Sequence, residues 1–232
     1  MKKIIISFIS FFAIFGSSSL KAQDFFDTSD APEFFSMSAR LALNTSNKTF
    51  PSGHFNMWNH NSWGTGFSIG ALANLHFKEY LTLQPGIFFE SRSGDYSYLT
   101  DYLNYLGKED THYEMGHIRG YYVTVPVMGV VKFNLAENIK WLAELGPYFQ
   151  LAIKQTGVNN VTVLYRLPQN NTYSSYTAKH HVFDVGLKIG TGLRFYDHYY
   201  VGVHYLAGFC NAWSQPAGGR NKSWEFSVGY DF

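Results

Sequence analysis

The sequence predicts an all-β fold, an eight-stranded antiparallel up-and-down transmembrane β-barrel. Eight stretches alternate between apolar and polar side chains with a period of two, as strands with two different faces do. No charged residue falls on the apolar face of any of these stretches. The chain is 19% aromatic and only 15% charged, whereas soluble domains are typically about 25% charged. Strands that cross lipid must close into a barrel, because lipid cannot satisfy open backbone edges.

The first four stretches set bulky apolar side chains against small or polar ones. In residues 35–44, one face carries aliphatic and aromatic side chains and the other carries mainly serine, arginine and asparagine. In residues 63–77, the polar face consists mainly of glycine, serine and asparagine. Residues 81–92 end their polar face with a glutamate and an arginine. Residues 121–133 carry a row of valines, which favour strands.

The last four stretches repeat this pattern. Residues 141–154 alternate from a tryptophan at one end to a lysine at the other. Residues 183–195 and 201–209 carry glycine at several positions of the polar face. Residues 224–232 close the chain with an aromatic side chain at every second position but one.

The sizes of the side chains indicate which face points outward. An eight-stranded barrel has an interior only just wide enough for side chains or one small ligand. The face rich in Trp, Phe, Tyr and Leu cannot all fit inside at protein packing density, so we expect it to face lipid. Aromatic residues near strand ends suit the interfacial girdles of such barrels: Trp63, Tyr80, Trp141, Tyr199, Tyr200 and Trp224.

The connections between the stretches alternate strictly in length. Long connections cover residues 45–62, 94–117, 155–178 and 210–222, and short ones lie near 78–79, 134–137 and 197–198. Outer-membrane barrels combine short periplasmic turns with long extracellular loops. This alternation therefore predicts a bacterial outer-membrane location with both chain ends in the periplasm.

The N-terminus resembles a cleaved signal peptide over residues 1–22, with Met1-Lys2-Lys3, an apolar stretch and small residues before Ala22. The alternative, a permanent anchor, is disfavoured because the apolar run is shorter than the roughly 20 residues of a spanning helix. We expect residues 23–34 to form a periplasmic N-terminal segment and residues 35–232 the barrel. Cleavage removes three of the 18 basic residues and leaves a slightly acidic chain, which does not suggest a nucleic-acid partner.

Charged residues on the polar face predict an interior ion-pair network that plugs the barrel, because buried charges require partners. Six basic and five acidic residues belong to this face: Arg40, Glu90, Arg92, Lys132, Glu144, Lys154, Asp184, Lys188, Arg194, Glu225 and Asp231. The alternative is a charge-lined conduit, for which eight strands leave little room. No cofactor is implied, and Cys210 has no second cysteine with which to form an internal disulfide.

Several short motifs resemble those of the outer-membrane β-barrel domain of Bacteroidetes, the PorT or porin-like family. They are Leu83-Gln84-Pro85-Gly86, Val125-Pro126 with Lys132 beyond, Gly146-Pro147-Tyr148, Asp184-Val185-Gly186-Leu187 and the chain end Ser227-Val228-Gly229-Tyr230-Asp231-Phe232. Thr124 departs from the pattern, since members often carry an acidic residue there. The resemblance implies a small outer-membrane barrel and raises the hypothesis of a component of type IX protein secretion.

The lipid face of the last strand resembles the signal that the outer-membrane insertion machinery recognises. It consists of Trp224, Phe226, Val228, Tyr230 and Phe232. The expected partners are therefore outer-membrane lipid, this machinery, and secretion-system or surface proteins reached through the long loops.

The long loops hold the remaining functional candidates. Three pairs of histidines could only bind a metal if three or four ligands converged: His54 and His60, His112 and His117, His180 and His181. Serine, histidine and aspartate occur without the spacing of a catalytic triad, so we expect no enzymatic activity. Residues 98–107 have helical spacing and fit either a short partner-binding helix or a strand extension or lid. We expect a plugged barrel with an accessory or surface-interaction role; the alternatives are type IX secretion and a narrow solute pore.

Overall fold

The computed structural model describes residues 25–49, 60–103, 109–156, 160–166, 173–179, 181–212 and 219–232. The predicted signal peptide lies outside this part of the chain, as do His54 and His180. In the described ranges, no helix has both the length and the apolar character to cross a membrane.

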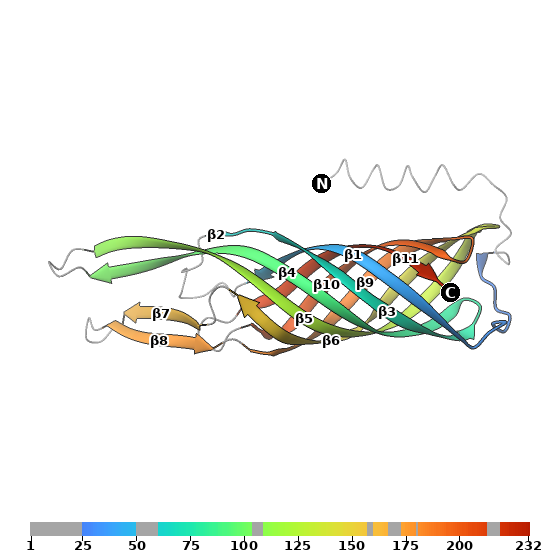
Figure 1. Ribbon diagram of the computed structural model, residues 1–232, viewed down its shortest axis with the longest axis horizontal. Coiled ribbons are helices and arrows are strands. Elements are labelled where there is room, and N and C mark those ends of the chain that lie inside the picture. Colours follow the sequence, from blue (N-terminus) through green and yellow to red (C-terminus); the bar gives the residue numbers. More distant parts are fainter. Residues whose placement is uncertain are drawn as a thin grey trace.

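Eight antiparallel strands form the closed wall of a barrel, which confirms the predicted fold class (Figure 1). The barrel strands are β1 (Phe35–Thr49), β3 (Gly64–Lys78), β4 (Leu81–Leu103), β5 (Glu109–Ala136), β6 (Ile139–Thr156), β9 (Phe183–Phe195), β10 (Tyr199–Asn211) and β11 (Arg220–Asp231). Each strand pairs with its neighbours in sequence, and β1 pairs with β11 to close the ring. Because no edge is left open around the wall, every strand can satisfy its backbone in lipid.

Tight turns join the strands at one end of the barrel, where β1 also begins and β11 ends (Figure 1). The turns are residues 79–80, 137–138 and 196–198. We call this end periplasmic, because short turns of outer-membrane barrels face the periplasm.

The opposite end contains more strand structure than the sequence predicted. β4 and β5 continue far beyond the other barrel strands as one long ribbon, paired out to Leu103 and Glu109 (Figure 1). The hypothesis of a helix over residues 98–107 is therefore wrong, and the strand extension is observed through Leu103. β2 (His60–Asn61) pairs with β4, and β7 (Asn160–Arg166) and β8 (Tyr173–Lys179) form a separate hairpin.

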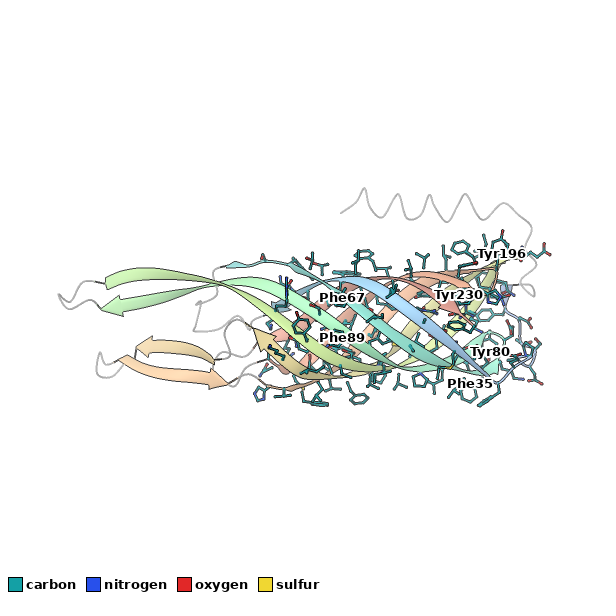
Figure 2. All side chains as sticks on the ribbon, in the orientation of Figure 1. Phe35, Phe67, Tyr80, Phe89, Tyr196 and Tyr230 are labelled. Atoms are coloured by element: carbon teal, nitrogen blue, oxygen red, sulfur yellow. The ribbon has the colours of Figure 1, made fainter. Side chains whose placement is uncertain are left out.

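The outward face is apolar along the height of the wall. Phe67, Phe89 and Tyr121 form a ladder across three strands, with ring centroids about 6 Å apart. Figure 2 shows Phe67 and Phe89 partway along the wall, and Phe35, Tyr80, Tyr196 and Tyr230 toward the periplasmic end. Exposing so much apolar surface to water would be energetically unfavourable, whereas contact of the same side chains with lipid is favourable.

Interior glycines make room for the bulky side chains that cross the lumen. A Cβ on Gly190 would collide with the His204 ring, and one on Gly229 would collide with the Arg40 side chain. The glycine-rich polar face is therefore a packing requirement, since the large inward side chains lie over the bare backbone of the neighbouring strands.

Candidate functional site

The interior of the barrel is the candidate site, and ten of the eleven predicted charged residues are buried in it. Five are basic and five acidic: Arg40, Arg92, Lys132, Lys188 and Arg194 against Glu90, Glu144, Asp184, Glu225 and Asp231. Their exposed fractions range from 2% to 7%, so each charge has lost most of its hydration. Such groups are tolerated only when neighbouring charges and hydrogen bonds replace that water.

Asp231 is shared by two arginines near the periplasmic end. Its carboxylate oxygens lie 2.6 Å from Arg40 Nη1 and 2.7 Å from Arg194 Nη2. The contact joins the last strand to β1 and to β9, so one carboxylate ties together three strands of the wall. Arg40 also donates to the backbone oxygens of Ala39 and Tyr230.

Glu144 is the centre of a second cluster. One of its oxygens accepts a hydrogen bond from Tyr200 Oη at 2.7 Å, and the other lies 2.7 Å from His204 Nε2. The guanidinium of Arg40 stacks over the Tyr200 ring, 4.2 Å from its centroid. This cation–π contact continues the chain of interactions from the Asp231 cluster into the middle of the barrel.

Two further pairs fill the lumen. Lys188 Nζ donates to Glu225 at 2.7 Å and lies 5.3 Å from the centre of the Phe88 ring. Arg92 lies 2.6 Å from Glu90, and the Gln150 amide donates to Glu90 at 3.3 Å. Each pair spans side chains of opposite charge in the low-polarity interior, where an ion pair is far stronger than in water.

The remaining buried charges lie near the two ends of the lumen. Lys132 Nζ is 3.3 Å from His76 Nδ1 on the periplasmic side. At the extracellular end, Asp184 accepts hydrogen bonds from the Asn221 amide at 2.9 Å and from the backbone N–H of Cys210 at 3.2 Å. A small cavity of about 10 Å³ beside Asp184 has room for about one water molecule.

The prediction that Lys154 lies inside the barrel is wrong, because its side chain is exposed on the outside of the wall. The cause is a β-bulge. Tyr121 pairs with Lys154 but the next residue, Tyr122, pairs with Ala152, so β6 has one extra residue here. The extra residue reverses the alternation, and Gln155 now points inward, where its amide donates to Tyr122 Oη at 2.7 Å.

Sequence reasoning missed several interior partners. Tyr200 was assigned to the lipid girdle, but it is only 3% exposed and lies inside the barrel. Tyr200 lies two and four residues before Gly202 and His204, which are on the polar face, so the period of two along the strand already places Tyr200 on that face. Tyr148, which donates to Asp184, and Gln150, which donates to Glu90, lie on the predicted polar face but were not recognised as partners of the buried charges.

Ion pairs and aromatic contacts stabilise the periplasmic end of the barrel. Lys140 bridges two turns, lying 2.8 Å from Glu79 and 2.7 Å from Asp197. Partial burial opposes ionisation of Asp197, but the hydrogen bond and charge of Lys140 outweigh it and lower the pKa of this carboxyl. The N-terminal segment packs against the same rim, where the Phe25 and Phe26 rings lie 5.1 and 4.8 Å from Phe133.

The predicted histidine pairs do not assemble a metal site in the described part of the chain. No three histidine, cysteine, aspartate or glutamate side chains with described positions converge there. Of the six loop histidines, His181 is exposed; His54 and His180 lie outside the described residues, and no side-chain position is described for the others.

An apolar outer wall around a charged, packed interior defines a bacterial outer-membrane β-barrel protein. A family model described as "Outer membrane protein beta-barrel domain" matches residues 22–213, and the chain belongs to this family. The location in the outer membrane follows. No curated protein sequence matches the chain.

Solved outer-membrane barrels are similar to the chain at low sequence identity. Ail, the attachment invasion locus protein of Yersinia pestis, solved with the heparin analogue sucrose octasulfate, is 13% identical; the alignment covers 86% of this chain and 100% of Ail, with a TM-score of 0.38. Neisserial surface protein A is 11% identical, with coverages of 86% and 100% and a TM-score of 0.44. OprG from Pseudomonas aeruginosa is 8% identical, with coverages of 88% and 98% and a TM-score of 0.39.

Proposed function

We propose that the protein is a non-enzymatic, plugged outer-membrane barrel that presents its extracellular strand ribbons to a surface or accessory partner. The observation that carries this proposal is the filled lumen. Ten buried charges, together with large side chains such as Tyr148 and Leu142, occupy the membrane-spanning interior. A solute would have to separate these charge pairs to pass, which costs several kcal/mol for each pair broken.

The ribbon of β4 and β5 supports the surface role. β4 has 23 residues and β9 has 13, so the excess of ten residues reaches about 33 Å at the usual rise of a strand. Pairing along this ribbon is one to one from Arg92 with Gly120 to Leu103 with Glu109. A two-stranded ribbon is only marginally stable alone, and a partner strand or surface would complete it.

Shortening the ribbon tests the surface role. Tyr96 and Gly116 are cross-strand partners, so residues 97–115 can be replaced by a two-residue turn without disturbing the register of the wall. The matched control shortens the β7–β8 hairpin between Thr162 and Thr177, which are also partners. We expect both variants to remain heat-modifiable barrels.

Crosslinking on intact cells with a membrane-impermeant reagent, followed by mass spectrometry, gives the readout. We expect partners that are recovered with the wild type and the control to be lost with the shortened β4–β5 ribbon. Recovery of the same partners with all three proteins would contradict a role for this ribbon.

Type IX secretion is a second candidate, supported by the sequence motifs that resemble the PorT family. Its test is genetic, in the species from which the chain comes. If secreted enzymes are exported normally in a deletion strain, this role is excluded, while the plugged barrel and its ribbon stay as proposed.

We also propose that the last strand is the assembly signal. Trp224, Phe226, Val228 and Tyr230 face outward on β11, and Phe232 is 73% exposed directly after it. Deletion of Phe232 should lower the amount of barrel in the outer membrane, measured by heat-modifiable mobility. An unchanged amount would argue against a signal at this residue.

A further inference from the structure

The buried charges are distributed unevenly along the lumen. Toward the periplasmic end, three buried cations lie with a single buried carboxylate: Arg40, Arg194 and Lys132 with Asp231. The other six of the ten buried charges are two basic and four acidic residues, and they lie further toward the extracellular side. Because a buried charge requires a counter-charge, the excess of cations at the periplasmic end calls for a partner.

The acidic side chains that surround the periplasmic end do not supply this partner. Glu79 and Asp197 both contact Lys140, at 2.8 and 2.7 Å, and Asp231 contacts the two arginines. No carboxylate in the described part of the chain forms an ion pair with Lys132. In this group four cations therefore meet three carboxylates, which leaves one positive charge unmatched.

The described neighbours of the Lys132 ammonium are neutral. Its side chain is 5% exposed, and Nζ lies 3.3 Å from His76 Nδ1. An ammonium group can only donate, so Nδ1 accepts, and the ring carries its hydrogen on Nε2, which lies 3.0 Å from Ser36 Oγ. Thr82 Oγ1, 2.9 Å from the same Nδ1, is neutral as well. The imidazole therefore provides a hydrogen-bond acceptor for Lys132 but no negative charge.

The register of the strands brings Arg194 close to Lys132. On β6, Leu142 pairs with Lys132 of β5. Two residues nearer the periplasmic turn, Lys140 pairs with Arg194 of β9. The two buried cations thus flank β6 at nearly the same height, and Arg194 is the charged group with the strongest electrostatic effect on Lys132. Two cations of this kind repel each other unless an anion lies between them.

Neither cation has used all of its hydrogen-bond donors. Arg194 Nη2 contacts Asp231 at 2.7 Å, but the buried Nε–H of the same guanidinium has no hydrogen-bond partner among the described residues. The Lys132 ammonium has three hydrogens, and the His76 ring is its one described acceptor. A buried donor without an acceptor costs free energy. An acceptor that enters from solution would therefore gain hydrogen bonds from both cations.

We propose that Lys132 and Arg194 bind a chloride ion that enters from the periplasm, past the partly exposed His76. One unmatched positive charge calls for one negative charge, so a monovalent ion fits better than a divalent one. A spherical ion can accept hydrogen bonds from any direction, which suits donors on two different strands. The ion would link β5 to β9 across β6 and complete the charge balance of the plug, independently of any partner of the extracellular ribbon.

The linewidth of the chloride NMR signal tests the proposal, because exchange with a protein site broadens this signal. The mature protein in an uncharged detergent is titrated with sodium chloride, as wild type and as the variants K132Q and R194Q. Since the Lys132 ammonium contacts only neutral groups, K132Q should keep the fold, which heat-modifiable mobility checks. The matched control is K78Q, because Lys78 lies at the same end but is exposed and paired with Asp30.

We expect saturable broadening with the wild type and K78Q, and an affinity at least about tenfold weaker in K132Q and R194Q. Broadening that is not saturable in the wild type, or that is unchanged in K132Q, would overturn the proposal. Displacement of chloride by sulfate at lower concentration than by bromide would overturn the preference for a monovalent ion.

Crystals of the wild type grown in bromide give a second test that needs no variant. Bromide replaces chloride and scatters anomalously, so it can be located directly. We expect an anomalous peak in contact with both Lys132 Nζ and Arg194 Nε. A map without a peak at these two atoms would contradict the site.

Discussion

The inner and outer faces of the barrel wall are built from alternate residues of the same strands, yet they meet opposite physical demands. On β6, Glu144, Tyr148 and Gln150 are buried in the lumen, whereas Leu145 and Phe149 are about half exposed to the outside. Inside, a polar group needs a specific partner, because no bulk water replaces its hydration. Outside, an apolar side chain needs none, because lipid accepts any apolar surface. The effect of a substitution on the free energy of unfolding should therefore depend more on the face that carries the residue than on the strand.

The largest effect is expected at the shared carboxylate of the inner face. D231N leaves Arg40 and Arg194 buried without the charge that both contact. We expect a loss of about 3–5 kcal/mol in the free energy of unfolding, measured by denaturant titration in lipid vesicles. D30N is the matched control, since Asp30 pairs with Lys78 in an exposed position and should leave stability unchanged. A D231N barrel as stable as the wild type would show that the inner charges do not depend on one another.

A charge on the outer face should cost less and should depend on depth. Phe149 lies midway between Leu145 and Ile153 on the outward apolar face of β6, and F149R should destabilise the barrel by about 2–4 kcal/mol in the same titration. Ile153 is the last apolar residue on this face of β6 before the exposed Lys154, which places it near the membrane boundary, so I153R should cost about 0–1 kcal/mol. Equal costs at the two positions would contradict the assignment of the membrane boundary to Ile153.

Added volume should also distinguish the faces. G190A places a methyl group against the His204 ring inside the lumen and should cost about 1–3 kcal/mol. A Cβ at Gly129, on the outer face, would meet only the Leu145 backbone oxygen at 3.5 Å, an ordinary contact. G129A should therefore be neutral, and thermal unfolding of the two variants side by side checks the difference. If both are neutral, the lumen is less tightly packed than proposed.

The smallest effect is expected at the periplasmic rim, where water screens the ion pairs. K140A removes the contacts to Glu79 and Asp197 and should cost at most about 1 kcal/mol. The pKa of Asp197 is lowered in the folded state, so its contribution is present above its ordinary pKa of 3.8 and is lost as the pH falls through the lower folded value. The stability difference between wild type and K140A should accordingly shrink below about pH 4. A difference that grows on acidification would have the wrong sign.

Much of the wall could be predicted from sequence, because a period of two along each strand records which face meets lipid. The stretch 183–195 matches β9 residue for residue. The bulge beside Ala152 could not be predicted, since one extra residue leaves no mark in composition and reverses only the last positions of β6. The ribbon of β4 and β5 was foreseen only as one of two alternatives, a strand extension over residues 98–107, because residues 94–117 lack the apolar alternation of a wall in lipid. Which inner charges pair depends on side chains from strands far apart in sequence, such as Glu144 and His204, and alternation does not encode that pairing.

Single-channel recording in planar bilayers tests the plugged interior most directly. The wild-type barrel should give no stable open channel across the accessible voltage range. The double variant E90S/R92S removes one acidic and one basic residue of a buried pair, so the net charge of the lumen does not change. It should show brief openings, which would prove that the barrel inserts and that openings can be detected. A stable open channel in the wild type would contradict the central claim that paired side chains seal the barrel.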